Sequence, residues 1–487
     1  MYENKTIDLI DLSDSYIVLG SGLNSISTVH GILDTKYNTE KKIFIIDAGL
    51  TKDTDLSFAN RVHNLKAPSP KFKIRANRYI FDTFKSMLNL SEQGFEAVGS
   101  LAKGGLSNIW GAGIQPYKNE ELSRFPYTLN EVKNIYSKIL NILLGSRNQV
   151  LIDNTDIKEK EFVFSDPILA INENANNSHC CHLKSCYDGC ISCNKNVFNS
   201  KDEIDKLINL NKIEYMPGLF IESIELEDEH YLIKCIEISS GRIINIIAST
   251  IYCCLGTIST SKIVLGLSKK SNQIPLLTTP GASFFIFSFR HFHKKNHSIL
   301  SSKSFAGKLN SNNYEGNIFP LSENLVCAYF GEFLGGILNL LFRKFIFSRL
   351  FIANIYFDSD MSLSKINYDR EGIKITAERT PALKQFSKKV VKVIKKEFLS
   401  HGLKIIPFSF KLMTPGQDIH YGGSVPMKNN PKNNQCNLNG ELKGFKNFYI
   451  SDASSMPYLA SKGQSFNSMV NSYYIARKSI VPTDKPQ

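Results

Sequence analysis

The sequence predicts an α/β domain with a parallel sheet, joined to a separate lobe that mixes strands and helices. The apolar run Tyr16–Gly20 leads into a glycine-rich turn, a helix-like stretch and a second apolar run within Lys42–Gly49. This order is the pattern of a βαβ unit. Glycine-rich motifs return at 104–113 and from Asp418 onward, so we expect the domain to be discontinuous in sequence. Residues 271–410 carry few such motifs and predict the separate lobe.

Composition limits the class of protein. The chain has 487 residues, of which 42% are hydrophobic and 21% are charged. These values are typical of a globular protein of about three domains, and they exclude a disordered chain, a fibrous repeat and a disulfide miniprotein. The N-terminus has no signal-peptide pattern and no apolar run reaches transmembrane length, so we expect a cytoplasmic protein.

The net charge of +13 favours acidic partners. Aromatic and basic residues are not interleaved as in an RNA-binding surface, so no nucleic-acid partner is predicted. The apolar segment Phe333–Phe351 contains three basic residues. It favours either an interfacial helix, with peripheral membrane contact, or a core helix that continues into a strand. The segment KKVVKVIKKEF at 388–398 predicts an amphipathic helix whose lysines form a solvated face.

The first glycine-rich turn has the features of a dinucleotide site. Gly20 and Gly22 follow a strand and open a helix, where a pyrophosphate can approach the backbone. Ser25 occupies the third position of the motif and is small enough for close packing. Asp47 ends the second strand, where a carboxylate can accept hydrogen bonds from a ribose. The sequence Asp47–Gly49 favours FAD over NAD.

Local patterns predict further elements. We expect a helix over Tyr127–Leu143 with Asn130 as its cap. Residues 212–255 alternate like the strands of a meander, and the segment after Gly256 has helical spacing.

Four segments in order resemble the glucose–methanol–choline (GMC) flavoprotein oxidoreductases. They are the turn at Gly20–Gly22 with its aspartate, the GGLSNIWG loop at 104–111, the segment IYCCLGTISTSKIVLGL at 251–267, and the tail with HYGGS and DASSMP. The resemblance implies a Rossmann-like FAD-binding domain and a substrate lobe built on an antiparallel sheet. It divides the chain into FAD-binding segments at 1–115, 201–270 and 411–487, a cap with the cysteine cluster at 116–200, and the substrate lobe at 271–410.

The resemblance also assigns residues to the flavin. Gly105, Ser107 and Asn108 would line it, and Asp452 and Ala453 would lie near the pyrophosphate and ribityl chain. Family members with covalent FAD carry a histidine at the position of Ile109, which cannot form that bond. We therefore expect non-covalent FAD.

His420 matches the active-site histidine of the family. Oxidation of an alcohol sends a hydride to the flavin and leaves a hydroxyl proton that needs a base, and neutral imidazole suits this role. The second pocket residue of the family is histidine or asparagine. The alignment puts Ser465 at that position, with Asn467 two residues later.

Five cysteines lie between Cys180 and Cys193. Thiolates at this density predict a metal site, either an iron–sulfur cluster or zinc, and the alternative is a set of free cysteines or disulfides. The pattern resembles the GMC-type sugar dehydrogenases that carry a cluster. That resemblance implies a [3Fe–4S] or [4Fe–4S] cluster whose ligands are drawn from Cys180, Cys181, Cys186 and Cys190.

Two functions follow from these features. The first is an FAD-dependent dehydrogenase that oxidises a sugar or polyol, free or linked to a lipid or nucleotide carrier. Its electrons would leave through the cysteine-bound cluster to an external acceptor. The alternative is a non-catalytic scaffold that keeps the flavin fold and uses structural zinc or free cysteines.

Overall fold

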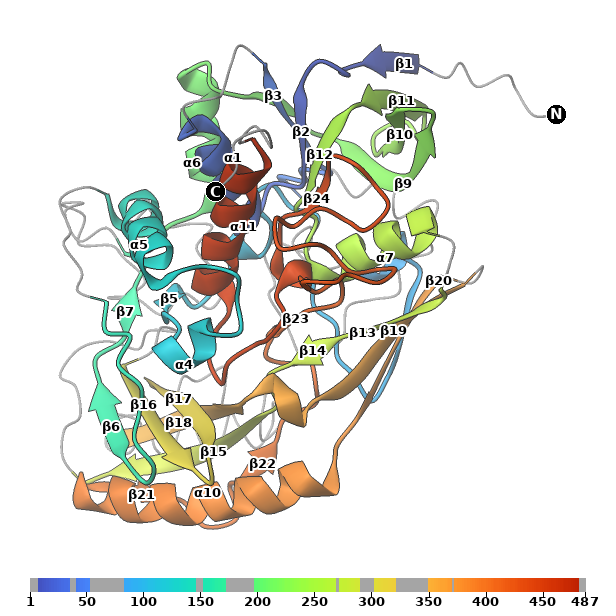
Figure 1. Ribbon diagram of the computed structural model, residues 1–487. Helices are drawn as coiled ribbons and strands as arrows, with labels where there is room; N and C mark the ends of the chain where they lie inside the picture. Colours follow the sequence, from blue (N-terminus) through green and yellow to red (C-terminus); the bar gives the residue numbers. More distant parts are fainter. Residues whose placement is uncertain are drawn as a thin grey trace.

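The structure is a computed structural model of the chain (Figure 1). It describes residues 8–35, 41–52, 83–145, 152–171, 197–268, 271–289, 302–320, 349–369 and 372–480. A parallel sheet with its helices lies above a large antiparallel sheet in Figure 1, and a long helix lies below the second sheet.

The parallel sheet has five strands in the order β24-β12-β2-β3-β8. Each strand is short and mostly apolar, and the inner strands are buried because helices and loops cover the sheet. Three separate regions of the sequence supply the strands, so the domain is discontinuous as expected. The strands are β2 (Tyr16–Leu19), β3 (Ile43–Ile46), β8 (Glu214–Met216), β12 (Thr250–Cys253) and β24 (Phe448–Ile450).

Helices α1 (Leu23–Leu33) and α11 (Ser465–Ser479) pack tightly against each other beside this sheet. Gly31 permits the contact, because a Cβ added there would lie 2.8 Å from the Cβ of Ala476. This contact joins the first helix of the chain to the last one.

A second sheet, β1-β11-β10-β9, flanks the parallel sheet. Strands β9 to β11 are antiparallel neighbours, as the meander pattern predicts. Helix α7 (Thr257–Ser268) follows β12 as expected. The strands are β1 (Asp8–Asp11), β9 (Leu219–Glu227), β10 (His230–Glu237) and β11 (Ile243–Ala248).

Helix α5 spans Leu129–Leu144, and the predicted cap is wrong. Thr128 caps the helix instead. Its hydroxyl accepts a hydrogen bond from the backbone of Glu131, whose carboxylate bonds back to the backbone of Thr128. This reciprocal pair satisfies two backbone donors, and Asn130 therefore lies inside the first turn.

The large antiparallel sheet has the order β21-β15-β18-β17-β16-β6, and β22 also pairs with β15. One face packs against helix α10 (Pro381–Ser400) through a core of aromatic and aliphatic side chains. Successive side chains of a strand point to opposite faces of the sheet, so the face turned away from α10 carries a different set of residues. The strands are β6 (Phe162–Ser165), β15 (Gly281–Ser288), β16 (Lys303–Leu309), β17 (Asn312–Pro320), β18 (Leu350–Phe357), β21 (Leu403–Ile405) and β22 (Lys411–Leu412).

A smaller sheet, β13-β19-β20-β4, packs beside α7. Short elements connect the sheets around the cavity described below. The small sheet contains β4 (Leu90–Gln93), β13 (Gln273–Pro275), β19 (Leu363–Asp369) and β20 (Gly372–Glu378). The short elements and the remaining helix are α3 (Phe84–Met87), β5 (Gly113–Ile114), α4 (Asn119–Leu122), β7 (Ile168–Leu169), α6 (Ser200–Asn209), β14 (Leu277–Thr278) and β23 (Tyr421–Gly422).

Within the described ranges, no helix has both the length and the apolar composition needed to cross a bilayer. Of the predicted interfacial segment Phe333–Phe351, residues 333–348 lie outside the described residues, and its last residues begin β18.

Candidate active site

One cavity of about 680 Å³ connects the parallel sheet to the antiparallel sheet. Its wall includes the turn after β2, the end of β3, the 105–111 loop, the start of α7 and one face of β16 to β18. Most of the residues predicted from sequence line it, although they come from distant segments. These are Gly20, Gly22, Asp47, Gly105, Ser107, His420, Asp452, Ala453 and Ser465.

The turn after β2 leaves an open space at the N-terminus of α1. Gly20 has φ of +92°, and a Cβ there would lie 2.7 Å from the carbonyl oxygen of Cys254. Gly22 caps α1, and a Cβ added to it would meet no atom within 4 Å. Backbone N–H groups at such a helix end favour an anion, so this cradle fits a pyrophosphate.

Asp47 lies at the end of β3, buried against the cradle. It accepts hydrogen bonds from the hydroxyls of Ser21 and Tyr215, the second at 3.0 Å. Burial raises the pKa of Asp47 to about 6, against the effect of the two hydroxyl groups. Ser21 also accepts a hydrogen bond from the backbone of Gly104 at 2.9 Å, which ties the turn to the second glycine-rich loop.

The two polar residues of the 104–111 loop have different positions. Ser107 lines the cavity, donates to the carbonyl of Gly104 at 2.6 Å and accepts from the backbone of Ser200 at 3.0 Å. Asn108 lies outside the cavity wall, and its amide donates to the carbonyls of Lys103 and Gly105. Asn108 therefore holds the shape of the loop.

Asp452 fixes the end of β24 to the start of α7. Its carboxylate accepts from the backbone of Gly256 at 2.9 Å and from the hydroxyl of Thr260 at 2.6 Å. Burial raises the pKa of Asp452, and these hydrogen bonds oppose that effect. Ala453 follows in the cavity wall, with its carbonyl bonded to the backbone of Gly423.

Ser25 was also predicted to belong to the nucleotide site, but it does not line the cavity. It is fully buried within α1, and its hydroxyl has no hydrogen-bond partner. The close packing of α1 that a small residue permits occurs at Gly31, which contacts α11.

His420 stands between the two sheets with its side chain 20% exposed. Its ring meets the ring of Tyr356 edge to face, with centroids 4.7 Å apart. Nδ1 faces the Asp418 carboxylate at 3.5 Å, which is longer than a hydrogen bond. Nε2 faces the other way, near Gly463, where an added Cβ would lie 3.7 Å from it.

Burial controls the protonation of this pair. It lowers the pKa of His420 to about 4 and raises the pKa of Asp418 to about 7. The backbone N–H of His420 and the hydroxyl of Thr279 donate hydrogen bonds to Asp418, and these bonds partly oppose the rise in its pKa. The imidazole is therefore neutral near pH 7 and can accept a proton.

Ser465 lines the cavity at the start of α11, in the same region as Gly463 and His420. Asn467 is outside the wall. Its amide donates to the carbonyl of Gln115 at 2.7 Å and accepts from the backbone of Tyr117 at 3.0 Å. It thereby positions Gln115, whose side chain accepts from the backbone of Gly463 at 2.8 Å.

A buried ion triad joins the cavity wall to α4. Lys462 is 1% exposed, and its Nζ lies 2.8 Å from Glu121 and 2.7 Å from Glu315. Burial raises the pKa of Glu121 to about 7, against the charge of Lys462. Burial alone would lower the pKa of Lys462, but the two carboxylates outweigh it and raise that pKa.

The antiparallel sheet presents a mixed wall to the cavity, in which polar side chains such as Ser304, Glu315 and Asn317 stand among apolar ones such as Ala306 and Phe319. Glu315 pairs with Tyr356 across β17 and β18, and Asn317 lies two residues further along the same face. The Ser304 hydroxyl on β16 donates to the side chain of Asn317 at 2.8 Å. Hydroxyl and amide groups in such a wall suit a substrate rich in hydrogen-bonding groups.

Sequence reasoning missed several residues of this site. Tyr215, Tyr356 and Glu315 carry no local motif, and only the fold brings Tyr215 to Asp47 and the other two to the cavity wall. Asp418 had a signal, because it stands two residues before His420. Gln464 also had one: it precedes Ser465, and its amide donates to the carbonyl of Tyr421 at 2.7 Å.

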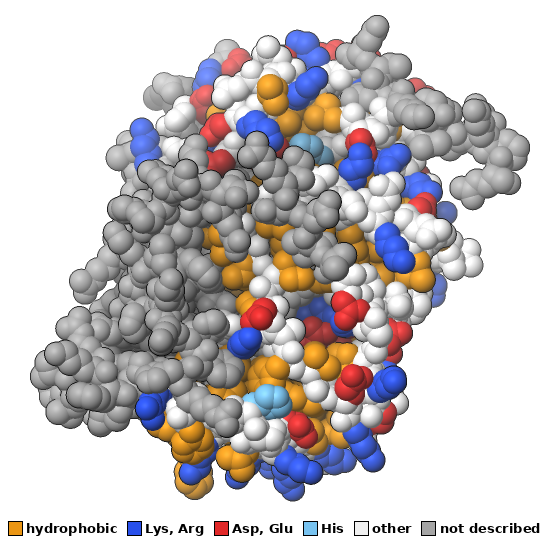
Figure 2. Space-filling model, turned by 90° about the vertical axis from the view of Figure 1, so that its left-hand side faces the viewer, with side chains coloured by type: hydrophobic (Ala, Val, Ile, Leu, Met, Phe, Trp, Pro, Cys, Tyr) orange, Lys and Arg blue, Asp and Glu red, His pale blue; other side chains and the backbone are white. Residues whose placement is uncertain are grey.

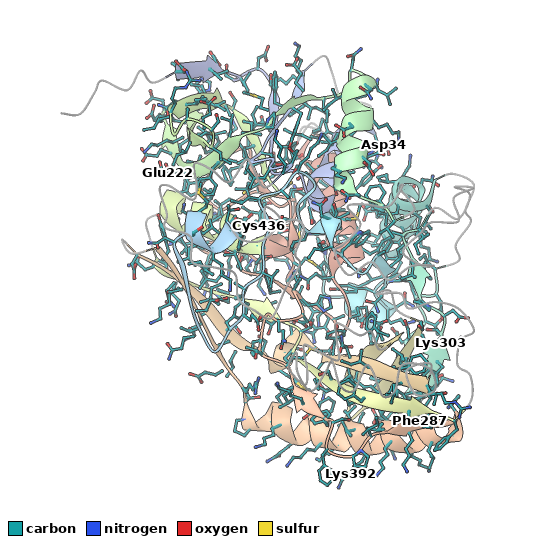
Figure 3. The ribbon with its side chains drawn as sticks, turned by 180° about the vertical axis from the view of Figure 1, so that it is seen from behind. Asp34, Glu222, Phe287, Lys303, Lys392 and Cys436 are labelled. Carbon is teal, nitrogen blue, oxygen red and sulfur yellow. The ribbon has the colours of Figure 1, made fainter. Side chains whose placement is uncertain are left out.

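The predicted metal ligands Cys180, Cys181, Cys186 and Cys190 lie outside the described residues. Within the described part of the chain, no group of three or more potential ligands is close enough to hold a metal ion. The four described cysteines are buried free thiols, and burial raises the pKa of each. They are Cys235, Cys253, Cys254 and Cys436, the last of which is labelled in the interior in Figure 3.

Comparison with known proteins gives a fold match alone. No protein-family model matches the sequence, and no curated protein matches it. The crystal structure of pyridoxine 4-oxidase from Mesorbium loti matches with a TM-score of 0.58 at 10% sequence identity, covering 95% of this chain and 98% of that chain. The match confirms the predicted fold class, a discontinuous Rossmann-like domain with a lobe built on an antiparallel sheet.

Proposed function

We propose that this protein is an FAD-dependent oxidoreductase that acts on the CH–OH group of a polar substrate. One observation carries the proposal. A single cavity runs from the glycine cradle and Asp47 to a neutral histidine and a wall that carries polar groups. The fold shared with pyridoxine 4-oxidase supports it.

The residues of the parallel sheet fit FAD. The open cradle at Gly22 would take the pyrophosphate, and Asp47 would accept hydrogen bonds from the ribose. Ser107 and Ala453 would line the rest of the cofactor. Ile109 also lines the cavity and has no group that could bond covalently to a flavin. When bound, FAD would accept the hydride from the substrate carbon.

His420 would take the hydroxyl proton at Nε2. Nδ1 is turned towards Asp418, so Nε2 is the ring nitrogen left to face the substrate. An ionised Asp418 would stabilise the imidazolium that forms. Gln115 would hold Gly463 in place beside the ring, and Ser465 would donate a hydrogen bond to the substrate oxygen.

The substrate class we propose is a sugar or polyol, free or linked to a carrier. Ser304, Glu315 and Asn317 support this choice, because they place hydrogen-bonding groups on the wall that faces the histidine. A closely packed apolar wall would favour a hydrocarbon substrate instead. The enzyme with the matching fold is named for an alcohol, pyridoxine, which is a further compound to test.

We also propose that electrons leave singly to an external acceptor through an iron–sulfur cluster, with ligands drawn from Cys180, Cys181, Cys186 and Cys190. The support is their spacing in the sequence. Zinc at these cysteines would serve structure and leave the flavin to reoxidise in another way.

Absorption spectroscopy of the anaerobically purified protein, with iron, zinc and sulfide analysis, tests both proposals. Flavin bands that bleach on addition of a polyol or sugar are expected, with iron and sulfide present. Flavin with zinc or no metal would overturn only the electron route. A protein without flavin, or with flavin that no alcohol reduces, would favour the scaffold function.

A further inference from the structure

Helix α10 exposes a lysine-rich face on the outside of the molecule. Its inner face packs on the antiparallel sheet through residues such as Phe386, Val390 and Ile394. In Figure 3 the helix forms the lower edge of the molecule, and Lys392 points away from the body. All six lysines of the helix are exposed: Lys384, Lys388, Lys389, Lys392, Lys395 and Lys396.

The charge of this face is not neutralised locally. Glu397 is the only acidic residue of α10, so six lysines and one glutamate leave a charge of +5. The ion pairs formed between described residues include none of these six lysines. The lysines extend over about 18 Å, at a rise of about 1.5 Å per residue. Lys404 and Lys411, both exposed, follow on β21 and β22.

Apolar side chains are exposed beside the lysines. Leu399, in the last turn of α10, is 59% exposed, and Phe289 is 52% exposed. The backbone of Phe289 donates to the carbonyl of Gly402 at 2.9 Å, which places it at the end of the helix. Phe408, between β21 and β22, is fully exposed. Figure 2 shows hydrophobic and basic side chains next to each other along the lower edge.

We propose that the α10 face, defined as its six lysines with Leu399, Phe289 and Phe408, docks on the surface of an anionic lipid bilayer. The lysines would lie among negatively charged headgroups, and the three apolar side chains would enter the headgroup boundary. The inner face of α10 stays in the core, so the contact would be shallow, reversible and sensitive to salt.

The composition of the face favours a bilayer over a nucleic acid. α10 contains no arginine, the residue whose planar guanidinium binds phosphate in a bidentate manner. Lysine is a compact point charge that suits diffuse attraction to a charged surface. The cavity is lined by the opposite face of the antiparallel sheet from the one that packs on α10, so docking is independent of the proposed catalysis.

Vesicle co-sedimentation of the full-length protein tests the proposal. Binding to phosphatidylserine–phosphatidylcholine vesicles is expected, with weak binding to pure phosphatidylcholine and release at high salt. Each lysine near an anionic surface contributes about fivefold in affinity. The triple variant Lys388→Gln/Lys392→Gln/Lys395→Gln should therefore bind about a hundredfold more weakly. Phe408→Ser should weaken binding and leave its salt dependence unchanged.

A matched triple variant controls for net charge. Lys365→Gln/Lys374→Gln/Lys432→Gln removes three exposed lysines from other surfaces and should bind like the wild type. Unchanged thermal midpoints and unchanged flavin content would show that both triple variants fold. Equal loss of binding in the two triples would overturn the proposal. Binding to single-stranded RNA without binding to anionic vesicles would overturn it as well.

Discussion

At the scale of single residues, the proposed chemistry depends on His420 and Asp418, whose pKa values burial shifts in opposite directions. His420 is neutral above about pH 4 because its ring is shielded from water. Asp418 ionises only near pH 7, since burial disfavours its charge. Nδ1 of the ring and the carboxylate are 3.5 Å apart, so each charge state changes the environment of the other group.

Replacement of His420 by alanine should lower turnover by at least about 100-fold, the contribution of a positioned general base. FAD should stay bound, because the cofactor residues lie on other elements. Turnover and the ratio of flavin to protein absorbance measure the two effects. A variant that keeps most of its turnover would show that another group takes the proton.

The pH dependence should report Asp418. Below about pH 4 His420 is protonated and cannot act as a base, and activity should rise again as Asp418 ionises near pH 7. Asp418→Asn should remove the step near pH 7 and keep the acidic limb. The profile of kcat/KM measures this. An unchanged profile would mean that Asp418 does not affect the histidine.

Stability provides a second readout of the same residue. The folded pKa of Asp418, about 7, lies above the ordinary value of 3.8. Its protonated form therefore stabilises the fold fully below the ordinary value, and this contribution is lost as pH rises through about 7. Asp418→Asn should flatten that part of the stability curve, measured by urea unfolding at pH values on either side of 7.

At the scale of elements, the turn between β2 and α1 contains two glycines with different expected roles. Gly20 is needed for the fold, and Gly22 is needed for the proposed cofactor. Gly20→Ala should lower the free energy of unfolding by about 2–4 kcal/mol, from positive-φ strain and the contact with Cys254. Gly22→Val should leave the apoprotein stable but prevent FAD binding, because its side chain would fill the open cradle. Thermal unfolding without cofactor and flavin titration distinguish the two variants. Equal destabilisation of the Gly20→Ala and Gly22→Val apoproteins would contradict the different roles assigned to the two glycines.

The Lys462 triad connects α4, β17 and the segment before α11. Lys462→Met would leave Glu121 and Glu315 buried without their cation, at a cost of about 3–5 kcal/mol. Lys308→Met is the control, since its pair with Glu120 is partly exposed and should cost about 1 kcal/mol or less. Denaturant unfolding of both variants measures the difference. Similar losses would show that the triad adds no special stability.

At the scale of the whole molecule, FAD should stabilise the fold because its site draws on distant segments. Free FAD at about 100 times its dissociation constant should add about 2.7 kcal/mol to the free energy of unfolding. The thermal midpoint of the apoprotein should therefore rise with FAD concentration. Gly22→Val should show no rise, and a rise in that variant would place the cofactor elsewhere.

Much of the fold was predictable because local patterns recur in order. The βαβ unit, the strands after residue 212 and the separate lobe all follow from apolar runs and glycine positions. The N-cap of α5 was not predictable from the sequence, because Thr128 and Asn130 are both of residue types that cap helices. The reciprocal bond with Glu131 decides between them. The cysteine cluster remains a prediction from its spacing.

The sequence by itself predicted the cradle and Asp47 from residues close together in the chain, and it predicted the fold class and the candidate base from the order of four short motifs. Only the tertiary structure decided that Asn108 and Asn467 support the site from outside its wall. It also decided which partners reach the cavity. Strand order and register place Glu315 beside Tyr356 in the cavity wall, and they place Tyr215 beside β3, where it bonds to Asp47.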